Sequence, residues 1–197
     1  MYYPSGTERS NARIQAPLLL AEIRALRRSS IERSPEVQQA LAIADKVEQR
    51  YDLSRADWFV PASDTLFAIL EPLAQPHLAS ALRDVGHEIF PQYVAILGIP
   101  AANVNTAMQL HCGADLVRRI CRIYSDSVVG PASGALVPDV VGARAGVTDT
   151  SLLPCPLQIG IFRGAGKLTG LFGESALVEH RCRSRGDTAC AYDLVSG

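Results

Sequence analysis

Apolar residues recur at helical spacing through the first half of the chain, and this pattern predicts a series of helices. Residues 16–28 are expected to form the first, because arginines gather towards the end of this segment, where cations suit the helix dipole. A second helix is marked by Ser34 as N-cap and by Pro35 at the first helical position. Ser63 is expected to cap a third helix, which Pro72 ends or kinks.

Two longer helices are predicted in the middle of the chain. Residues 77–97 carry one apolar row at helical spacing, and residues 105–128 carry two, with Cys112 and Cys121 among them. Because the helix over 105–128 is apolar over most of its circumference, we expect it to be central and its two cysteines to be packed in the core. His111 lies on its polar row, which favours a solvated side chain over a haem ligand.

The pattern changes at residue 130, where Gly, Ala, Val and Pro become frequent. Residues 130–154 predict one or two strands with turns. Residues 157–172 fit a helix, and the glycines within it are expected to allow close backbone packing. Residues 176–195 are expected to form a hairpin around a turn at 184–187. Helices followed by strands and one more helix indicate an α+β fold.

Composition and charge narrow the classes of function. The chain has 197 residues, 48% of them hydrophobic and 20% charged, which are ordinary values for a globular protein. A net charge of −1 gives no reason to expect a nucleic-acid partner. No apolar run is long enough to cross a bilayer, and the first residues lack the pattern of a secretory signal, so we expect a cytoplasmic protein. We divide the chain into a helical extension, residues 1–55, and a domain, residues 56–197.

The cysteines in the last part of the chain suggest a metal site. A tight hairpin would bring Cys182 and Cys190 close together, and two thiolates are half of a tetrahedral zinc site. The alternative is that they are small buried hydrophobic residues. Strand alternation places His180 on the face of Cys182, whereas a bulge would favour Glu179 as a ligand. Cys155, between two prolines, is the candidate from outside the hairpin.

These residues carry a resemblance to a known family. A cysteine, a helix, a Glu-x-x-Cys strand, a glycine turn and a final cysteine follow one another, and they do so here at Cys155, Glu179, Cys182, Gly186 and Cys190. The arrangement resembles the 4-vinyl reductase domain family, which includes bacteriochlorophyll-pathway proteins and the sensor domains of phenol-responsive activators. The resemblance implies that zinc is bound, in a structural role, by Cys155, Glu179, Cys182 and Cys190, which sides with Glu179 over His180.

The resemblance also implies a fold and a function. The fold would be an antiparallel sheet packed with helices, shared with haem nitric-oxide sensors and TRAPP vesicle-tethering subunits, and a homodimer would be plausible. A stand-alone domain would bind a hydrophobic small molecule, an aromatic hydrocarbon or a tetrapyrrole, in an apolar pocket. The aromatic and sulfur-containing wall candidates are Phe67, Phe90, Tyr93, Met108 and Tyr124.

Two other functions stay open for a chain of this family. One is a tetrapyrrole vinyl reductase or an accessory protein to one, and the other is a protein-interaction module like the TRAPP subunits. A reductase needs a hydride or electron source, and cofactors usually leave a binding motif in the sequence. We find no such motif in this sequence, so binding is favoured over catalysis.

Overall fold

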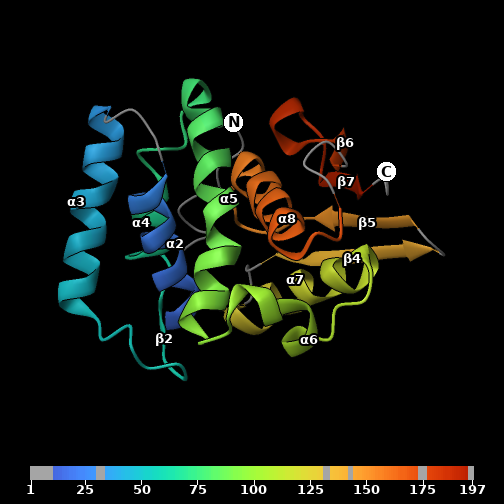
Figure 1. Cartoon of the computed structure of the whole chain (residues 1–197). Coiled ribbons are helices and arrows are strands. Elements are labelled where there is room, and N and C mark those ends of the chain that lie inside the picture. Colours follow the sequence, from blue (N-terminus) through green and yellow to red (C-terminus); the bar gives the residue numbers. More distant parts are fainter. Residues whose placement is uncertain (1–10, 30–33, 131–133, 142–143, 173–176, 195–197) are drawn as a thin grey trace.

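The computed structural model of the chain describes residues 11–29, 34–130, 134–141, 144–172 and 177–194. Helices make up most of it, and a four-stranded antiparallel sheet lies at one side (Figure 1). The predicted α+β class is therefore confirmed. The described part of the chain contains no helix that combines the length and the apolar character needed to cross a membrane.

The predicted helices form, with changes at their ends. Their bounds are α2 (Ala16–Arg28), α3 (Pro35–Arg50), α4 (Leu66–Leu70), α5 (Ala79–Ile96), α6 (Val104–Met108), α7 (Gly113–Ser127) and α8 (Cys155–Thr169), with short 3₁₀ turns at 76–78, 101–103 and 183–185. Ser34 caps α3 as predicted, because its Oγ accepts a hydrogen bond from the backbone N–H of Val37 at 3.4 Å. Ser63 does not cap α4, since its hydroxyl donates to the neighbouring Asp64 and the helix begins only after Thr65.

The long helix predicted over residues 105–128 is two helices. The chain breaks between α6 and α7 at Gln109, whose φ of 57° is left-handed and cannot continue a right-handed helix. The break leaves Cys112 exposed, so its predicted place in the core is wrong, whereas Cys121 is buried as expected. His111 is exposed, in agreement with the prediction. α7 covers β4 and β5 instead of running through the centre.

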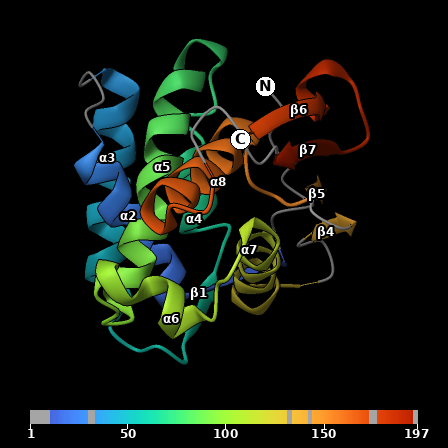
Figure 2. The ribbon, with the colours of Figure 1, turned by 45° about the vertical axis from the view of Figure 1, so that its right-hand side comes forward.

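Glycines let α5 and α8 cross with their backbones in contact. Figures 1 and 2 both show α8 beside α5. A Cβ atom on Gly160 would collide with the carbonyl oxygen of Arg83, and one on Gly164 would collide with that of His87. On the facing helix, a Cβ on Gly86 would meet the carbonyl oxygen of Leu157. The glycines of α8 thus serve close packing, as the sequence predicted.

A small three-stranded sheet ties the start of the chain to its middle. β1 (Arg13–Gln15) lies between β2 (Phe59–Pro61) and β3 (Val128–Val129), and both pairings are antiparallel. The side chain of Ile14 is fully buried, and α2 packs along α5. β1 and α2, which precede residue 55, pack directly on elements that follow it. The division of the chain at residue 55 stays a prediction, and residues 1–10 lie outside the described residues.

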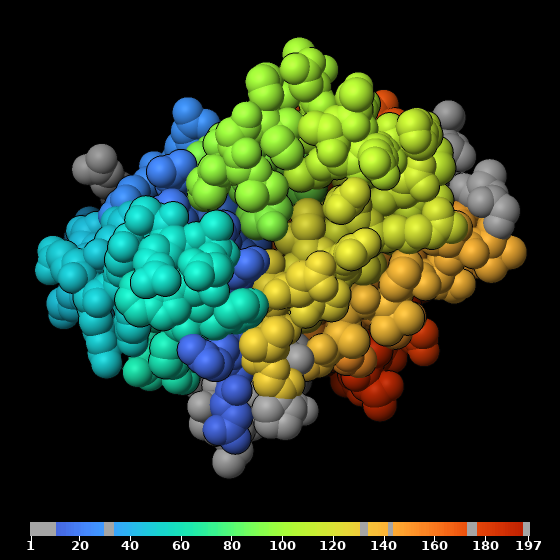
Figure 3. Space-filling view, turned by 90° about the horizontal axis from the view of Figure 1, so that it is seen from below, coloured from blue at the N-terminus to red at the C-terminus, as the bar shows by residue number. Residues whose placement is uncertain are grey.

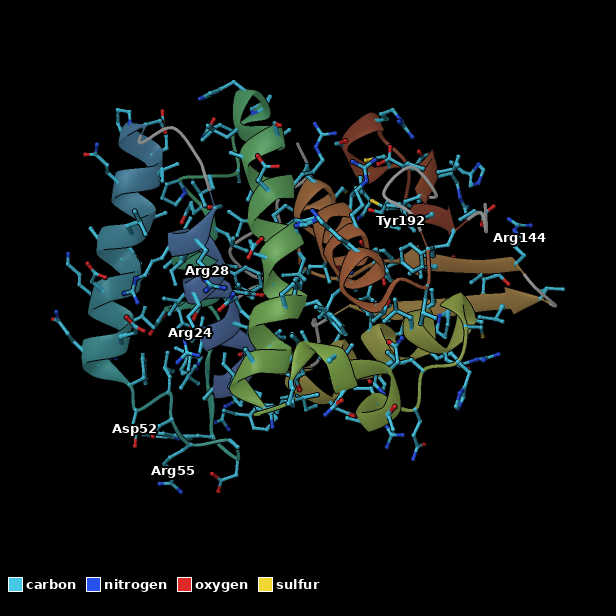
Figure 4. All side chains as sticks on the ribbon, viewed as in Figure 1. Arg24, Arg28, Asp52, Arg55, Arg144 and Tyr192 are labelled. Carbon is cyan, nitrogen blue, oxygen red and sulfur yellow. The ribbon has the colours of Figure 1, made fainter. Side chains whose placement is uncertain are left out.

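The larger sheet carries the predicted hairpin at one side, with β6 at the edge and β7 as an inner strand. Its strands are β4 (Leu136–Val141), β5 (Arg144–Asp149), β7 (Cys190–Leu194) and β6 (Leu177–Arg181), in that spatial order. α8 packs on this sheet through Phe162, whose ring centre lies 6.4 Å from that of Tyr192. Figure 4 shows Tyr192 beside α8. On the underside, α6, α7 and the strands β4 and β5 form one continuous face, in lime green, yellow and orange (Figure 3).

Candidate functional site

Three buried thiols meet where α8 begins and the hairpin turns. Cys155 is the first residue of α8, Cys182 follows β6, and Cys190 opens β7. Their Sγ atoms all lie within 4.8 Å of one another, and the Sγ atoms of Cys155 and Cys190 are 2.7 Å apart. The structure therefore brings together three of the four predicted metal ligands, from segments 35 residues apart in the chain.

Two of the sulfur atoms have hydrogen-bond partners in the turn that follows Cys182. The backbone N–H of Arg183 points to Cys190 Sγ at 3.4 Å, and Ser184 Oγ lies 2.9 Å from Cys182 Sγ. The pKa of Cys190 is lowered, first because the Cys155 thiol donates a hydrogen bond to it, and the pKa of Cys155 is raised for the same reason. The hydrogen bond between the two groups therefore favours the thiolate at Cys190 over the thiolate at Cys155.

Glu179 and His180, the two candidates for a further ligand, both have partners in the structure. Glu179 Oε1 lies 2.8 Å from the guanidinium of Arg185, and His180 Nε2 lies 2.8 Å from Asp193 Oδ2. The pairing of β6 with β7 shifts register between Glu179 and Arg181, so a bulge is present where it would favour Glu179. Glu179 is outside the group of thiols within 4.8 Å of one another.

A buried ion pair supports the thiol cluster, and sequence reasoning missed it. Arg183, in the turn after Cys182, lies 3.7 Å from the carboxylate of Asp149, at the end of β5. The same guanidinium donates to the carbonyl oxygens of Ser151 at 2.6 Å and Leu153 at 3.3 Å. It therefore fixes the segment before α8 to the hairpin. An arginine beside a glycine turn is ordinarily exposed, so no signal in the sequence pointed to its burial.

A second candidate site is a partly open cavity of about 30 Å³ among the helices and β4. Its walls come from α2, α5, α7, α8, β4 and the segment before α8, and consist of Leu18, Glu22, Ile89, Phe90, Tyr93, Ile120, Ile123, Tyr124, Leu136, Leu153, Gln158 and Ile161. All but a few of these side chains are apolar. This composition is typical of a small-molecule site, although the volume has room for only about two water molecules.

Three of the predicted wall residues line this cavity and two do not. Phe90, Tyr93 and Tyr124 face it. Phe67 is fully buried within α4 and is outside the cavity wall, and Met108 lines a separate surface hollow beside Arg119. The long-helix prediction misplaced Met108, because the chain turns immediately after it at Gln109.

Glu22 and Gln158 are the polar groups of the cavity that the sequence reasoning did not identify. Glu22 has a relative exposure of 4% and Gln158 of 0%. Neither the carboxylate oxygens of Glu22 nor the amide atoms of Gln158 have a hydrogen-bond partner among the described residues. A signal for Glu22 exists, since it follows Leu18 by four positions and precedes Leu26 by four, on the apolar face of α2.

Comparison with known proteins gives a structural match and no family. No family model matches the chain, and no curated protein matches it. Solved structures do match, among them a doubly substituted Tt H-NOX protein, with 12% identity, 92% of this chain and 93% of that chain covered, and a TM-score of 0.45. At this identity and TM-score the match carries no inference about a ligand or a site, so the site rests on its own geometry.

Proposed function

We propose that the chain is a small-molecule-binding domain in which zinc holds the C-terminal hairpin to α8. The observation that carries this is the double role of the start of α8. Its first residue, Cys155, belongs to the thiol cluster, and Gln158 and Ile161, in the next turn, line the cavity. A metal bound by the thiols would thus fix the helix that forms one wall of the binding site.

The residues of the cluster fit zinc chemically. Zinc takes thiolate sulfur at about 2.3 Å, so tetrahedral coordination would set the sulfur atoms roughly 3.8 Å apart. The Cys155 and Cys190 sulfur atoms, 2.7 Å apart, would need to separate by a small rotation of their side chains. We propose Glu179 as the fourth ligand, which would have to leave Arg185 to reach the metal. When bound, the ion supplies folding free energy and no open position for chemistry.

The size of the cavity decides which ligands fit. Apolar cavities of about 150 Å³ hold benzene, and this one measures about 30 Å³. A tetrapyrrole would require the helices to separate, so a small aromatic hydrocarbon or a smaller molecule is favoured. For the same reason we favour binding over a tetrapyrrole reductase activity.

A protein-interaction module is the second candidate, favoured by the small cavity and by one exposed strand. Val137 and Val141 point to the same side of the edge strand β4, with relative exposures of 53% and 72%. Pairing of β4 with a second copy would give the homodimer that the family resemblance implies. Sedimentation of the full chain tests this: a dimer that Val141→Lys converts to monomer supports it, and a monomer at every concentration rejects it.

The primary experiment measures zinc and ligand binding on the same preparations. Protein purified without an affinity metal is expected to hold about one zinc per chain, and Cys182→Ser to lose it. Cys112→Ser, which removes an exposed thiol, is the matched control and should keep its zinc. Xenon and small aromatic molecules are then titrated and followed by NMR, and Ile161→Phe, which fills the cavity, should reduce their binding. A metal-free wild type, or xenon binding that Ile161→Phe leaves unchanged, would overturn the corresponding part of the proposal.

A further inference from the structure

A hollow on the protein surface is lined mainly by charged side chains and lies apart from the apolar cavity. Its volume is about 480 Å³, which is in the range of small-molecule sites. Its wall includes Arg28, the last residue of α2, Arg83, in the first half of α5, and Arg163, in α8. Figures 1 and 2 show α5 between α2 and α8, so three neighbouring helices contribute one arginine each. No described residue lines both the hollow and the cavity.

A close helix contact holds the cationic side chains of the hollow near one another. Arg83 and His87 are one turn apart on α5, so they lie on one face of that helix. Arg163 and Lys167 have the same spacing on α8. Between these pairs the two backbones touch, since a Cβ atom on Gly160 would lie 2.2 Å from the carbonyl oxygen of Arg83. The helices are therefore positioned before any ligand arrives, which lowers the cost of binding.

The guanidinium groups of the three arginines are not engaged by the described protein. No ion pair or hydrogen bond joins the side chains of Arg28, Arg83 and Arg163 to another described residue. The wall of the hollow also contains two carboxylates, Asp84 and Glu88, and neither forms an ion pair with these arginines within the described part of the chain. Three guanidinium groups that stay unpaired in the presence of carboxylates keep their N–H donors available for an anion of better geometry.

We infer that this hollow binds a phosphate monoester of a sugar or another small polyol, a ligand in addition to the one proposed for the apolar cavity. The described wall carries four cationic side chains, the three arginines and Lys167, against two carboxylates, so its net charge is +2 with His87 neutral. A phosphate monoester carries about −1.5 to −2 at pH 7 and matches this charge. The planar guanidinium also binds two phosphate oxygens at once.

The rest of the wall indicates that the alcohol part of the ester is polar. None of the described wall residues is Phe, Tyr, Trp, Leu, Ile or Val, so no side chain is present on which a nucleobase could stack or an acyl chain could pack. Asp84 and Glu88 offer carboxylate oxygens that accept hydrogen bonds from hydroxyl groups. The volume of about 480 Å³ leaves room for a hexose beside the phosphate group.

Calorimetry of the full chain with glucose 6-phosphate tests this inference. At pH 8, where the probe is a dianion, glucose 6-phosphate is expected to bind, and its affinity should fall as salt is added. Glucose, the match without phosphate, should bind at least about 100-fold more weakly, because it gains no charge-assisted hydrogen bonds. Arg83→Gln and Arg163→Gln should each weaken binding of glucose 6-phosphate about tenfold or more. Arg24→Gln, which alters an exposed arginine of α2 outside the hollow (Figure 4), should behave as wild type.

Several results would overturn the inference. Glucose 6-phosphate that does not bind, or that binds the two arginine variants as tightly as wild type, would exclude the hollow as its site. Inorganic phosphate that binds as tightly as glucose 6-phosphate would indicate a site for the anion alone. Binding to vesicles that contain phosphatidic acid, without binding of glucose 6-phosphate, would indicate a lipid surface as the partner. Zinc content and xenon binding should be the same in the arginine variants and in wild type, so the proposed function stands or fails separately.

Discussion

The guanidinium of Arg183 lies 3.7 Å from the carboxylate of Asp149, and both side chains are buried beside the thiol cluster. Their backbones belong to the turn before β7 and to the end of β5. The pair therefore links the strand that leads towards α8 to the hairpin that carries two of the thiols. Two supports hold this corner of the fold together: an ion pair present in the described structure, and the proposed metal.

Removal of one partner of this pair should be strongly destabilising. Arg183→Met leaves Asp149 buried without its counter-charge, and at pH 8, above the pKa of about 7 of Asp149, the expected loss is about 3–5 kcal/mol in the free energy of unfolding by urea. The double variant with Asp149→Asn should recover the part of that loss that comes from the unpaired carboxylate, while the carbonyl oxygens of Ser151 and Leu153 still lack their donor. Arg122→Met, which breaks an exposed pair with Asp126, should change stability by less than about 1 kcal/mol. Equal effects of the two arginine variants would contradict the structural role of Arg183.

Glu179 and His180 should differ in their effect on zinc. Glu179→Gln removes the proposed fourth ligand and is expected to weaken zinc binding by about tenfold or more, as measured by competition with a chelator. His180→Asn should leave the affinity unchanged, because His180 is engaged with Asp193 on the exposed side of β6. If His180→Asn weakened zinc binding and Glu179→Gln did not, the fourth ligand would be His180, as regular strand alternation indicates.

The contact between α5 and α8 should not tolerate a methyl group. In Gly160→Ala the new Cβ meets the backbone of Arg83, which cannot move without separating the two helices. The expected cost is about 1–3 kcal/mol in unfolding by urea, together with weaker xenon binding, since α5 and α8 both line the cavity. Gly113→Ala is the control, because its Cβ would lie 3.6 Å from a ring atom of Phe172, an ordinary contact. A stable Gly160→Ala variant would mean that the helices cross less closely than described.

Stability should fall as pH rises through the range set by Glu22. Burial raises the pKa of this carboxyl from 4.5 to about 8, so between these values the native state keeps a proton that the unfolded state has released. The contribution of Glu22 is therefore most favourable below pH 4.5 and is lost by pH 8, at a cost on the order of 3 kcal/mol by pH 7. Asp149, with a pKa raised to about 7 by burial, acts in the same direction.

Glu22→Gln isolates the share of Glu22 in this pH dependence. The variant should be more stable than wild type at pH 7 by about 3 kcal/mol and should have a flatter pH profile between 5 and 8, measured by urea unfolding. Glu88→Gln serves as the control for a carboxylate outside the cavity. If Glu22→Gln has the same stability as wild type and the same dependence of stability on pH, the Glu22 carboxylate is stabilised in solution by a partner that the described structure does not contain.

Local signals in the sequence were enough for most helices and for the hairpin. Ser34 and Pro35 mark the start of α3 because capping depends only on neighbouring residues. The turn around Gly186, which brings Cys182 and Cys190 together, also depends on residues that are close in the sequence. The glycine spacing in α8 correctly indicated a close helix contact.

Features that depend on tertiary packing were missed. Nothing around Gln109 resembles a helix stop, yet the chain adopts a left-handed conformation there. The prediction of one continuous helix therefore placed Cys112 and Met108 wrongly. Periodicity places Glu22 on the apolar face of α2, but that this face lines a cavity depends on α5, α7 and α8 closing over it. Arg183 likewise finds Asp149 only because β5 and β7 are neighbours.

The order of strands in the larger sheet has a consequence for synthesis on the ribosome. β7 follows all its sheet partners in the chain, yet it occupies an inner place between β5 and β6. A nascent chain can pair β4 with β5 early, but β6 has no neighbour until residues 190–194 have been made. Until then the edges of β5 and β6 stay open to other chains. Chains stalled before Cys190 are therefore expected to depend on chaperones and to aggregate, even though most of the helical layer is already complete.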